Sequence, residues 1–134
     1  MDGVRERTRE RWTKSLATPG WRRAWGSFDG DRLVGSANVA GGDLAAGLHR
    51  VTLGMGILHG YRRQGIGTCL LDRAIEWCRG EPSIVWLDLG VFDDNLPAQA
   101  LYRKSGFEEI GKTPDRWRID GHRIVQTEMT LRVD

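Results

Sequence analysis

The sequence predicts a mixed α/β domain in which helices pack on one central sheet, and three observations lead to this fold class. The predicted elements follow the order strand–strand–strand–helix–strand–helix–strand–strand. A glycine-rich turn at residues 60–68 joins an extended apolar run to an amphipathic helix, as in a strand–helix–strand unit with parallel strands. The 134 residues, of which 40% are hydrophobic, are enough for one core, so a single domain is expected over residues 1–134.

The first half of the chain is expected to contain one helix and three strands. Residues 4–17 predict a helix, because apolar side chains recur at i, i+4 spacing until a Pro-Gly pair ends the pattern. Residues 21–28 and 32–40 predict two strands that are joined by an Asp-Gly-Asp turn. A third strand is expected over about residues 49–58, where apolar side chains alternate with polar or small ones.

Two glycines, Gly54 and Gly56, interrupt this third strand on either side of Met55. Glycine weakens strand pairing, and it often marks a bulge or a place where a ligand approaches the backbone. A tight contact between the strand and a helix explains the same residues, so both interpretations stay open.

The second half is expected to contain two helices and three strands. Residues 66–79 predict an amphipathic helix that ends at a C′ glycine, Gly80. Residues 84–92 are apolar almost throughout and predict a central strand buried on both faces. A short helix to Ser105 follows, and two last strands are expected near residues 107–112 and 123–133, joined by a polar loop.

The glycine-rich turn, Tyr61–Thr68, is a candidate anion site. Such a turn directs several backbone N–H groups to one spot at the positive end of a helix, and a pyrophosphate fits there. Arg62 and Arg63 add side-chain charge at its mouth. An ATP-binding P-loop is not expected, because Ile66-Gly67 stands where Lys-Ser/Thr is needed. The dinucleotide pattern G-x-G-x-x-G fails as well, since no third glycine follows.

Two motifs resemble those of the GNAT superfamily of N-acetyltransferases, which bind acetyl-CoA. Arg62-x-x-Gly65-x-Gly67 resembles the family's R/Q-x-x-G-x-G/A pyrophosphate loop. One helix and one strand later, residues 91–108 resemble the segment V-x-x-x-N-x-x-A-x-x-L-Y-x-K-x-G-F-E. The resemblance, which runs from about Arg5 to the C-terminus, implies a mostly antiparallel twisted sheet with one splayed parallel strand pair and helices on both faces. The family's first strand and helix have no counterpart before Met1.

The resemblance also implies roles for particular residues. In the family, the strand before the loop bulges and holds the pantetheine arm, so N–H groups near Ile57 and Leu58 would face the thioester and stabilise an oxyanion. Tyr102 would protonate the departing CoA thiolate, although it could instead merely pack at the cofactor edge. Asn95 would cap the last helix, and it would also contact the cofactor. The cofactor-binding residues implied are Ile57, Leu58, Arg62, Arg63, Gln64, Gly65, Ile66, Gly67, Thr68, Asn95 and Tyr102.

The sequence departs from the family at the usual general base. Many members carry a Glu just before Leu-Gly on the third strand, whereas this chain has Thr52, whose hydroxyl cannot accept a proton at neutral pH. Asp88 is expected to be the catalytic base, because it is the lone carboxylate of a buried strand; a paired structural carboxylate is the alternative. Other candidates are His49, His122 and Glu128, and an amine that arrives neutral needs no protein base.

The function expected from these features is transfer of an acetyl group from acetyl-CoA to a primary amine of a small molecule or peptide, by direct attack in a ternary complex. The alternative is a non-catalytic acyl-CoA-binding regulator of the same fold. An RNA-associated module that uses the Arg/Trp patches is disfavoured, since the net charge is only +2. No metal, membrane segment or secretory signal is expected, which makes the cytoplasm the default compartment. An unpaired sheet edge would favour a homodimer.

Overall fold

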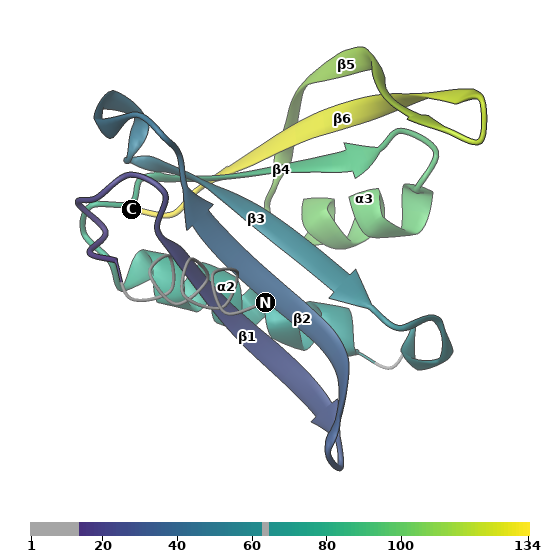
Figure 1. The fold of residues 1–134 in the computed structure, drawn as a ribbon, viewed down its shortest axis with the longest axis horizontal. Coiled ribbons are helices and arrows are strands. Elements are labelled where there is room, and N and C mark those ends of the chain that lie inside the picture. The colour runs from purple at the N-terminus through teal and green to yellow at the C-terminus, as the bar shows by residue number, and fades with distance from the viewer. Residues whose placement is uncertain (1–13, 63–64) are drawn as a thin grey trace, which may run out of the picture. The chain divides into compact units, whose positions relative to one another are not determined.

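The structure is a computed structural model that describes residues 14–62 and 65–134. Those residues form a mixed sheet of six strands with one parallel pair, in the order β1-β2-β3-β4-β6-β5, together with two α-helices (Figure 1). The mixed α/β fold class is therefore confirmed. The elements are β1 (Arg22–Asp29), β2 (Arg32–Gly41), β3 (Arg50–Ile57), α2 (Ile66–Arg79), β4 (Trp86–Phe92), α3 (Leu96–Lys104), β5 (Glu108–Ile119) and β6 (His122–Arg132), with short 3₁₀ turns at Ala45–Gly47 (η1) and His59–Tyr61 (η2).

The chain divides into two compact units, Met1–Leu87 with Val133–Asp134 and Asp88–Arg132. Strand β4 crosses the boundary, so the units are continuous within a strand. The single domain expected from the sequence stays a prediction. Most of the helix expected over residues 4–17 lies outside the described residues, and residues 14–17 form a bend and a turn rather than a helix.

In the first unit, α2 packs on strands β1, β2 and β3 (Figure 1). The helix has the predicted bounds, and it buries the apolar rows expected from its 3.6-residue period, namely Leu70, Leu71, Ala74, Ile75 and Cys78. Gly35 of β2 lies directly under it, because a Cβ there would come within 3.0 Å of Ile66 and 3.2 Å of Leu70. Gly80 is the C-cap of the helix, with a helical φ of −78°, and not the C′ residue expected from the sequence.

The β2–β3 pairing corrects the bulge expected at Gly54 and Gly56. Antiparallel register with β2 runs without a shift from Gly35↔Ile57 to Gly41↔Val51. Gly54 lies opposite Asn38, whose amide nitrogen would be 2.9 Å from an added Cβ. This glycine therefore makes room for a side chain on the neighbouring strand, and neither a bulge nor a helix contact accounts for it.

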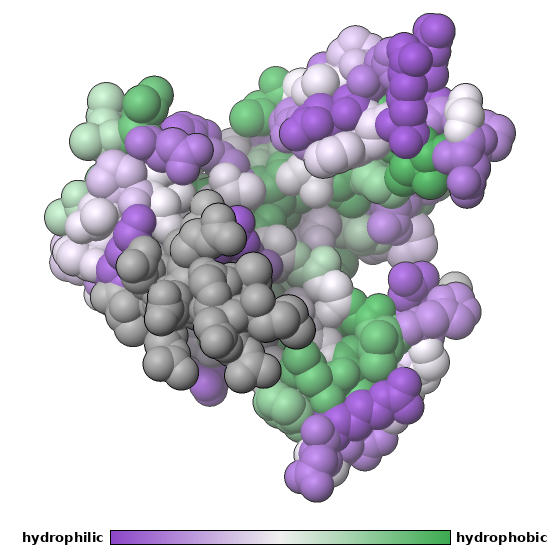
Figure 2. Space-filling model, in the orientation of Figure 1, coloured by the Kyte–Doolittle hydropathy of each residue, from purple (hydrophilic) through white to green (hydrophobic). Residues whose placement is uncertain are grey.

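The face of β1–β3 opposite α2 carries small or polar side chains that remain accessible. Ala24 of β1 and Thr52 and Gly56 of β3 are exposed there. Towards the β1–β2 turn this hairpin also exposes Phe28 and Leu33, and Figure 2 shows apolar surface over the end of these strands beside the hydrophilic turn. A helix-covered face and an open face thus follow from the two-residue period of the strands.

Two expectations for the second half of the chain are wrong. In β4, burial alternates, with Leu87, Leu89 and Val91 buried and Gly90 and Phe92 exposed, so this strand is not buried on both faces. The long polar loop expected after residue 112 is absent from the described residues, because β5 continues to Ile119 and pairs with β6. The pairing shifts register between Thr113 and Trp117, and this irregularity hid the strand from a period-2 reading. None of the described helices has the length and hydropathy needed to span a membrane.

Candidate functional site

The turn before α2 places a left-handed glycine at the start of the helix. Gly65 is the N-cap of α2 with φ 77°, a left-handed conformation that suits glycine. Glycine has no side chain that could cap the helix, and the first turn of this 14-residue helix holds no acidic residue, so neither group occupies the N–H groups at its start. Arg62 is extended and exposed just before the turn. Arg63 and Gln64 lie outside the described residues.

A tyrosine ties the start of this loop to the β1–β2 turn. The Tyr61 hydroxyl donates to the Asp29 carboxylate at 2.6 Å, and the Arg32 guanidinium lies 5.9 Å from the Tyr61 ring centroid. The hydrogen bond to Asp29 is the main cause that raises the pKa of Tyr61, since ionisation would place two negative charges together. These contacts fix where the loop leaves β3.

The two backbone amides expected to face a thioester differ in their hydrogen bonding. The Leu58 N–H donates to the Val34 carbonyl at 2.9 Å, so it is already used by β2. Donors alternate between the two sides of an antiparallel strand, and this places the Ile57 N–H on the side away from β2. Of the two amides, only the Ile57 N–H is left unused by β2, and the expectation that the Leu58 N–H faces a ligand is wrong.

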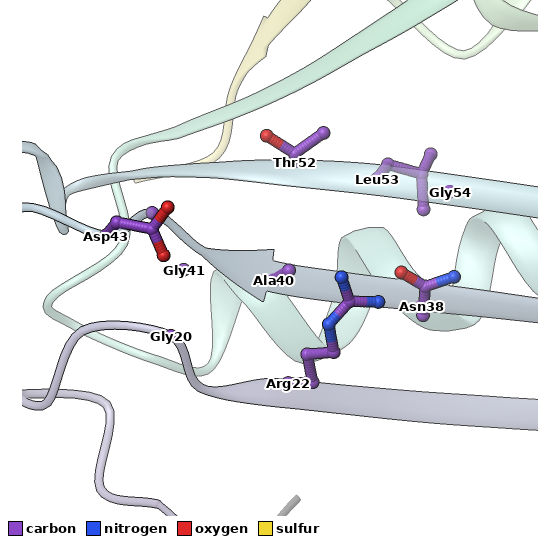
Figure 3. Close-up of a pocket in the computed structure, with 10 residues that line it drawn as sticks. Gly20, Arg22, Asn38, Ala40, Gly41, Asp43, Thr52, Leu53 and Gly54 are labelled. Carbon is purple, nitrogen blue, oxygen red and sulfur yellow. The ribbon is translucent and has the colours of Figure 1, made fainter. Parts of the chain in front are cut away.

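The open face of β1–β3 contains a cavity of about 340 Å³. Figure 3 shows the Arg22 side chain extending from β1 towards β2, with Asn38 on β2 and Thr52 on β3 around the same space. Asp43 contributes a carboxylate from the loop that follows β2. The other lining residues are Gly20, Ala40, Gly41, Gly42, Leu53 and Gly54. Charged and neutral hydrogen-bonding groups thus meet over a floor of small residues.

In the second unit, the start of α3 is fixed by side-chain hydrogen bonds. Asn95 is the N-cap, and its side-chain oxygen accepts from the Ala98 N–H at 3.3 Å, as expected. The buried Gln99 side chain donates to the Phe92 and Asp93 carbonyls at 3.0 and 2.9 Å, which clamps the turn between β4 and α3. Because these bonds set where α3 begins, they also set where Tyr102 lies.

Tyr102 is half-buried, and it packs edge to face on Phe107 with 5.8 Å between ring centroids. Burial raises the pKa of Tyr102, so the phenol is protonated over the whole neutral range. Among the described residues the hydroxyl has no hydrogen-bond partner, and it can therefore donate to a ligand.

The carboxylates considered as bases are engaged by neighbouring side chains. Asp88 is half-buried and accepts a hydrogen bond from the Thr130 hydroxyl at 2.6 Å. Glu128 accepts from Thr113 at 3.0 Å and from the Gln126 amide at 2.8 Å. The described residues contain no cluster of three or more His, Cys, Asp or Glu side chains that could hold a metal ion.

The structure groups the expected residues by unit. The anion loop, Ile57 and the cavity belong to the first unit, whereas Asp88, Asn95 and Tyr102 belong to the second. Reasoning from the sequence missed Arg22 and Asn38 as site residues, because only strand register places them beside Thr52 on one face. It also missed Gln99, for which no sequence signal was available.

Residues 3–107 match the Acetyltransferase (GNAT) family. The chain belongs to this family. The resemblance of the loop and of the second motif to GNAT sequences is thereby confirmed.

One GNAT relative is the L-amino acid N-acetyltransferase AaaT of Escherichia coli (strain K12), which is 30% identical over 101 residues. The alignment covers 75% of this chain and 62% of that protein, so the GNAT chain spans less than two thirds of the relative's length.

Solved GNAT structures share the fold. The acetyltransferase of GNAT family from Streptococcus pneumoniae has a TM-score of 0.87 at 24% identity. The structural alignment covers 99% of this chain and 77% of the Streptococcus pneumoniae chain. The structure of yncA from Salmonella typhimurium with its cofactor acetyl-CoA has a TM-score of 0.78 at 19% identity. The structural alignment covers 84% of this chain and 65% of the yncA chain.

Proposed function

We propose that this GNAT protein transfers the acetyl group of acetyl-CoA to a primary amine. The observation that carries the proposal is the start of α2, where a left-handed glycine and an acid-free first turn leave backbone N–H groups for a pyrophosphate. Support comes from family membership and from the acetyl-CoA that is bound in yncA. A relative that acts on L-amino acids supports a small amine acceptor, and a peptide N-terminus is the other class we expect.

In this proposal the chain's own groups divide the work of binding and of proton transfer. The amides of Ile66, Gly67 and Thr68 bind the pyrophosphate, with Arg62 adding charge and Arg63, Gln64 and Gly65 completing the loop. The amine nitrogen attacks the thioester carbonyl, and the Ile57 N–H donates to the oxyanion. When the carbon–sulfur bond breaks, Tyr102 gives its proton to the departing sulfur. Asn95 contacts the cofactor in addition to capping α3.

The proton that the amine loses needs an acceptor, and we propose Asp88 for this role. Its carboxylate accepts from Thr130, which would hold it in one orientation. Thr52, at the position of the family's usual Glu, lies exposed in the cavity and cannot serve as a base. The same observation favours the second candidate, a non-catalytic acyl-CoA-binding protein. The cytoplasmic location, a homodimer and the lack of nucleic-acid binding stay predictions.

Thermal melting with CoA, acetyl-CoA and ATP tests the binding part of this proposal. A ligand at 100 times its Kd stabilises by about 2.7 kcal/mol, which shifts the midpoint of a domain of this size by several degrees. CoA and acetyl-CoA should produce that shift, and ATP should produce much less. No shift with CoA would refute the proposal.

Release of free thiol from acetyl-CoA, measured against a panel of amines, then distinguishes the two candidates. The panel should include L-amino acids, polyamines, aminoglycosides and peptides with free N-termini. Turnover with any of them supports the enzyme. Stabilisation by CoA without turnover on the whole panel supports the binding protein.

A further inference from the structure

The cavity on the open face of β1–β3 brings one arginine and two neutral polar groups together. Arg22 pairs with Ala40, and Ala40 pairs with Thr52, so these three residues form one row across the strands. Neighbouring strands are about 4.8 Å apart, which separates the Arg22 and Thr52 backbones by about 10 Å. Ala40 between them has only a methyl group, so the Arg22 side chain can reach over it, as Figure 3 shows. Asn38 lies two residues from Ala40 along β2, on the same face.

Arg22 differs from the basic residues that are neutralised by the protein. Arg118 pairs with Asp115, Lys112 with Asp93 and Arg103 with Glu109. For the half-buried Arg22 side chain, in contrast, the described residues provide neither an ion pair nor a hydrogen-bond acceptor. A guanidinium that lines a cavity without an ion pair to a protein carboxylate is suited to a ligand anion.

The composition of the cavity selects a carboxylate over a phosphate. A guanidinium matches a carboxylate with two parallel hydrogen bonds, and the Asn38 amide and Thr52 hydroxyl supply further donors beside it. Asp43 lines the same cavity, and its charge opposes a dianion more strongly than a monoanion. A volume of about 340 Å³ is at the small end of ligand cavities.

We propose that Arg22, Asn38 and Thr52 bind a carboxylate group of the acceptor, so the amine substrate is a molecule that carries both an amine and a carboxylate. This inference rests on the proposed function and names its acceptor class. A free amino acid and the C-terminus of a short peptide present the same carboxylate chemistry. Thr52 then has a binding role in place of the catalytic role of the glutamate that it replaces.

The test compares acceptors that differ only in the carboxylate. The probes are L-amino acids, the corresponding L-amino acid amides, and dipeptides with a free C-terminus. Their binding is measured by calorimetry on the protein alone and on the protein saturated with CoA, and their turnover by thiol release. The variants are Arg22→Gln and, as a matched control, Arg73→Gln, which removes an exposed arginine from α2.

Wild type should bind at least one acid or dipeptide about 10- to 100-fold more tightly than the matching amide, because a hydrogen-bonded ion pair is lost with the carboxylate. Arg22→Gln should weaken binding of the acid by about the same factor, leave the amide unchanged and bring their ratio close to one. Arg73→Gln should keep the wild-type ratio. Preference for free acids over dipeptides identifies amino acids as the source, and the reverse preference identifies peptides.

Equal binding of acids and amides by wild type would overturn the inference, and so would an equal loss for both in Arg22→Gln. Absence of acid binding to both the free and the CoA-saturated protein would overturn it as well. The proposed function fails by a different result, namely the lack of CoA stabilisation in wild type. CoA stabilisation of Arg22→Gln should equal that of wild type, because Arg22 is not part of the anion loop.

Discussion

Replacing Gly65 by alanine should lower the thermal stability of the protein and its affinity for CoA. Gly65 has φ 77° at the N-cap of α2, next to the N–H groups that we propose bind the pyrophosphate. A Cβ added there has no heavy atom within 4 Å, so overpacking contributes nothing to the effect. The whole effect comes from the left-handed backbone, which is unfavourable for a residue with a Cβ.

The magnitude follows from that conformational strain. A left-handed L-residue costs about 1–2 kcal/mol, which for a domain of this size corresponds to a melting midpoint about 3–8 °C lower. If Gly65→Ala relieves the strain by opening the turn, CoA binding should weaken by up to about 30-fold, the equivalent of the same free energy. Gly30→Ala is a matched control, because Gly30 has φ 60° and also has nothing within 4 Å, but it lies in the β1–β2 turn.

Thermal melting and calorimetry with CoA on wild type and both variants provide the assay. Gly65→Ala should lose about 1–2 kcal/mol in total, divided between stability and CoA affinity according to how far the turn opens, whereas Gly30→Ala should lose stability alone. A Gly65→Ala protein that matches wild type in both melting midpoint and CoA affinity would show that the left-handed turn is not required. An equal loss of CoA affinity in Gly30→Ala would show that the effect is not specific to the turn before α2.

The remaining predictions concern titratable groups. Tyr102→Phe should lower kcat about 100-fold or more where acyl transfer limits turnover, and full activity in this variant would remove the acid role. Because burial raises the pKa of Tyr102, the alkaline limb that this residue produces in the pH–rate profile should lie above about pH 10. Asp88→Asn should lower kcat about 100-fold, while its amide oxygen can still accept from Thr130, and full retention of kcat would make Asp88 structural. Cys69 is exposed and Cys78 is buried, and desolvation is the main cause that raises the pKa of Cys78 to about 12. A thiol reagent at pH 8 should therefore label one cysteine in the native protein and both after denaturation. Because the folded pKa of Cys78 is the higher one, its stabilising contribution should be complete below about pH 9 and decline as pH rises towards 12, which denaturant titrations at several pH values can measure.

The local signals in the sequence were strong where neighbours along the chain decide the structure. Helix α2 begins and ends at the predicted residues, because an apolar period of 3.6, a glycine at each end and a following proline act within one turn of the chain. The Asn95 cap is local in the same way, since its side chain bonds to an N–H three residues later. The anion loop and the family's second motif are also contiguous, so family and fold class were available from sequence.

The errors occurred where distant strands decide the outcome. The glycine at position 54 was read as a bulge, but its cause is Asn38, sixteen residues earlier and opposite on β2. The chain after residue 112 was read as a loop because irregular pairing in β5 destroys the alternation that marks a strand. The Leu58 N–H was expected to face a ligand, whereas its acceptor, the Val34 carbonyl, belongs to another strand.

The sequence by itself determined the family, helices α2 and α3 and the glycine at the start of α2, because each depends on residues within a few positions of one another. Only the tertiary structure decided which side chains share the open face of β1–β3. Arg22, Asn38 and Thr52 are unrelated along the chain, and a shift of one residue in either strand pairing would turn one of them to the α2 side. Strand register is set by packing of the opposite face against α2, and so the acceptor cavity is a consequence of the core.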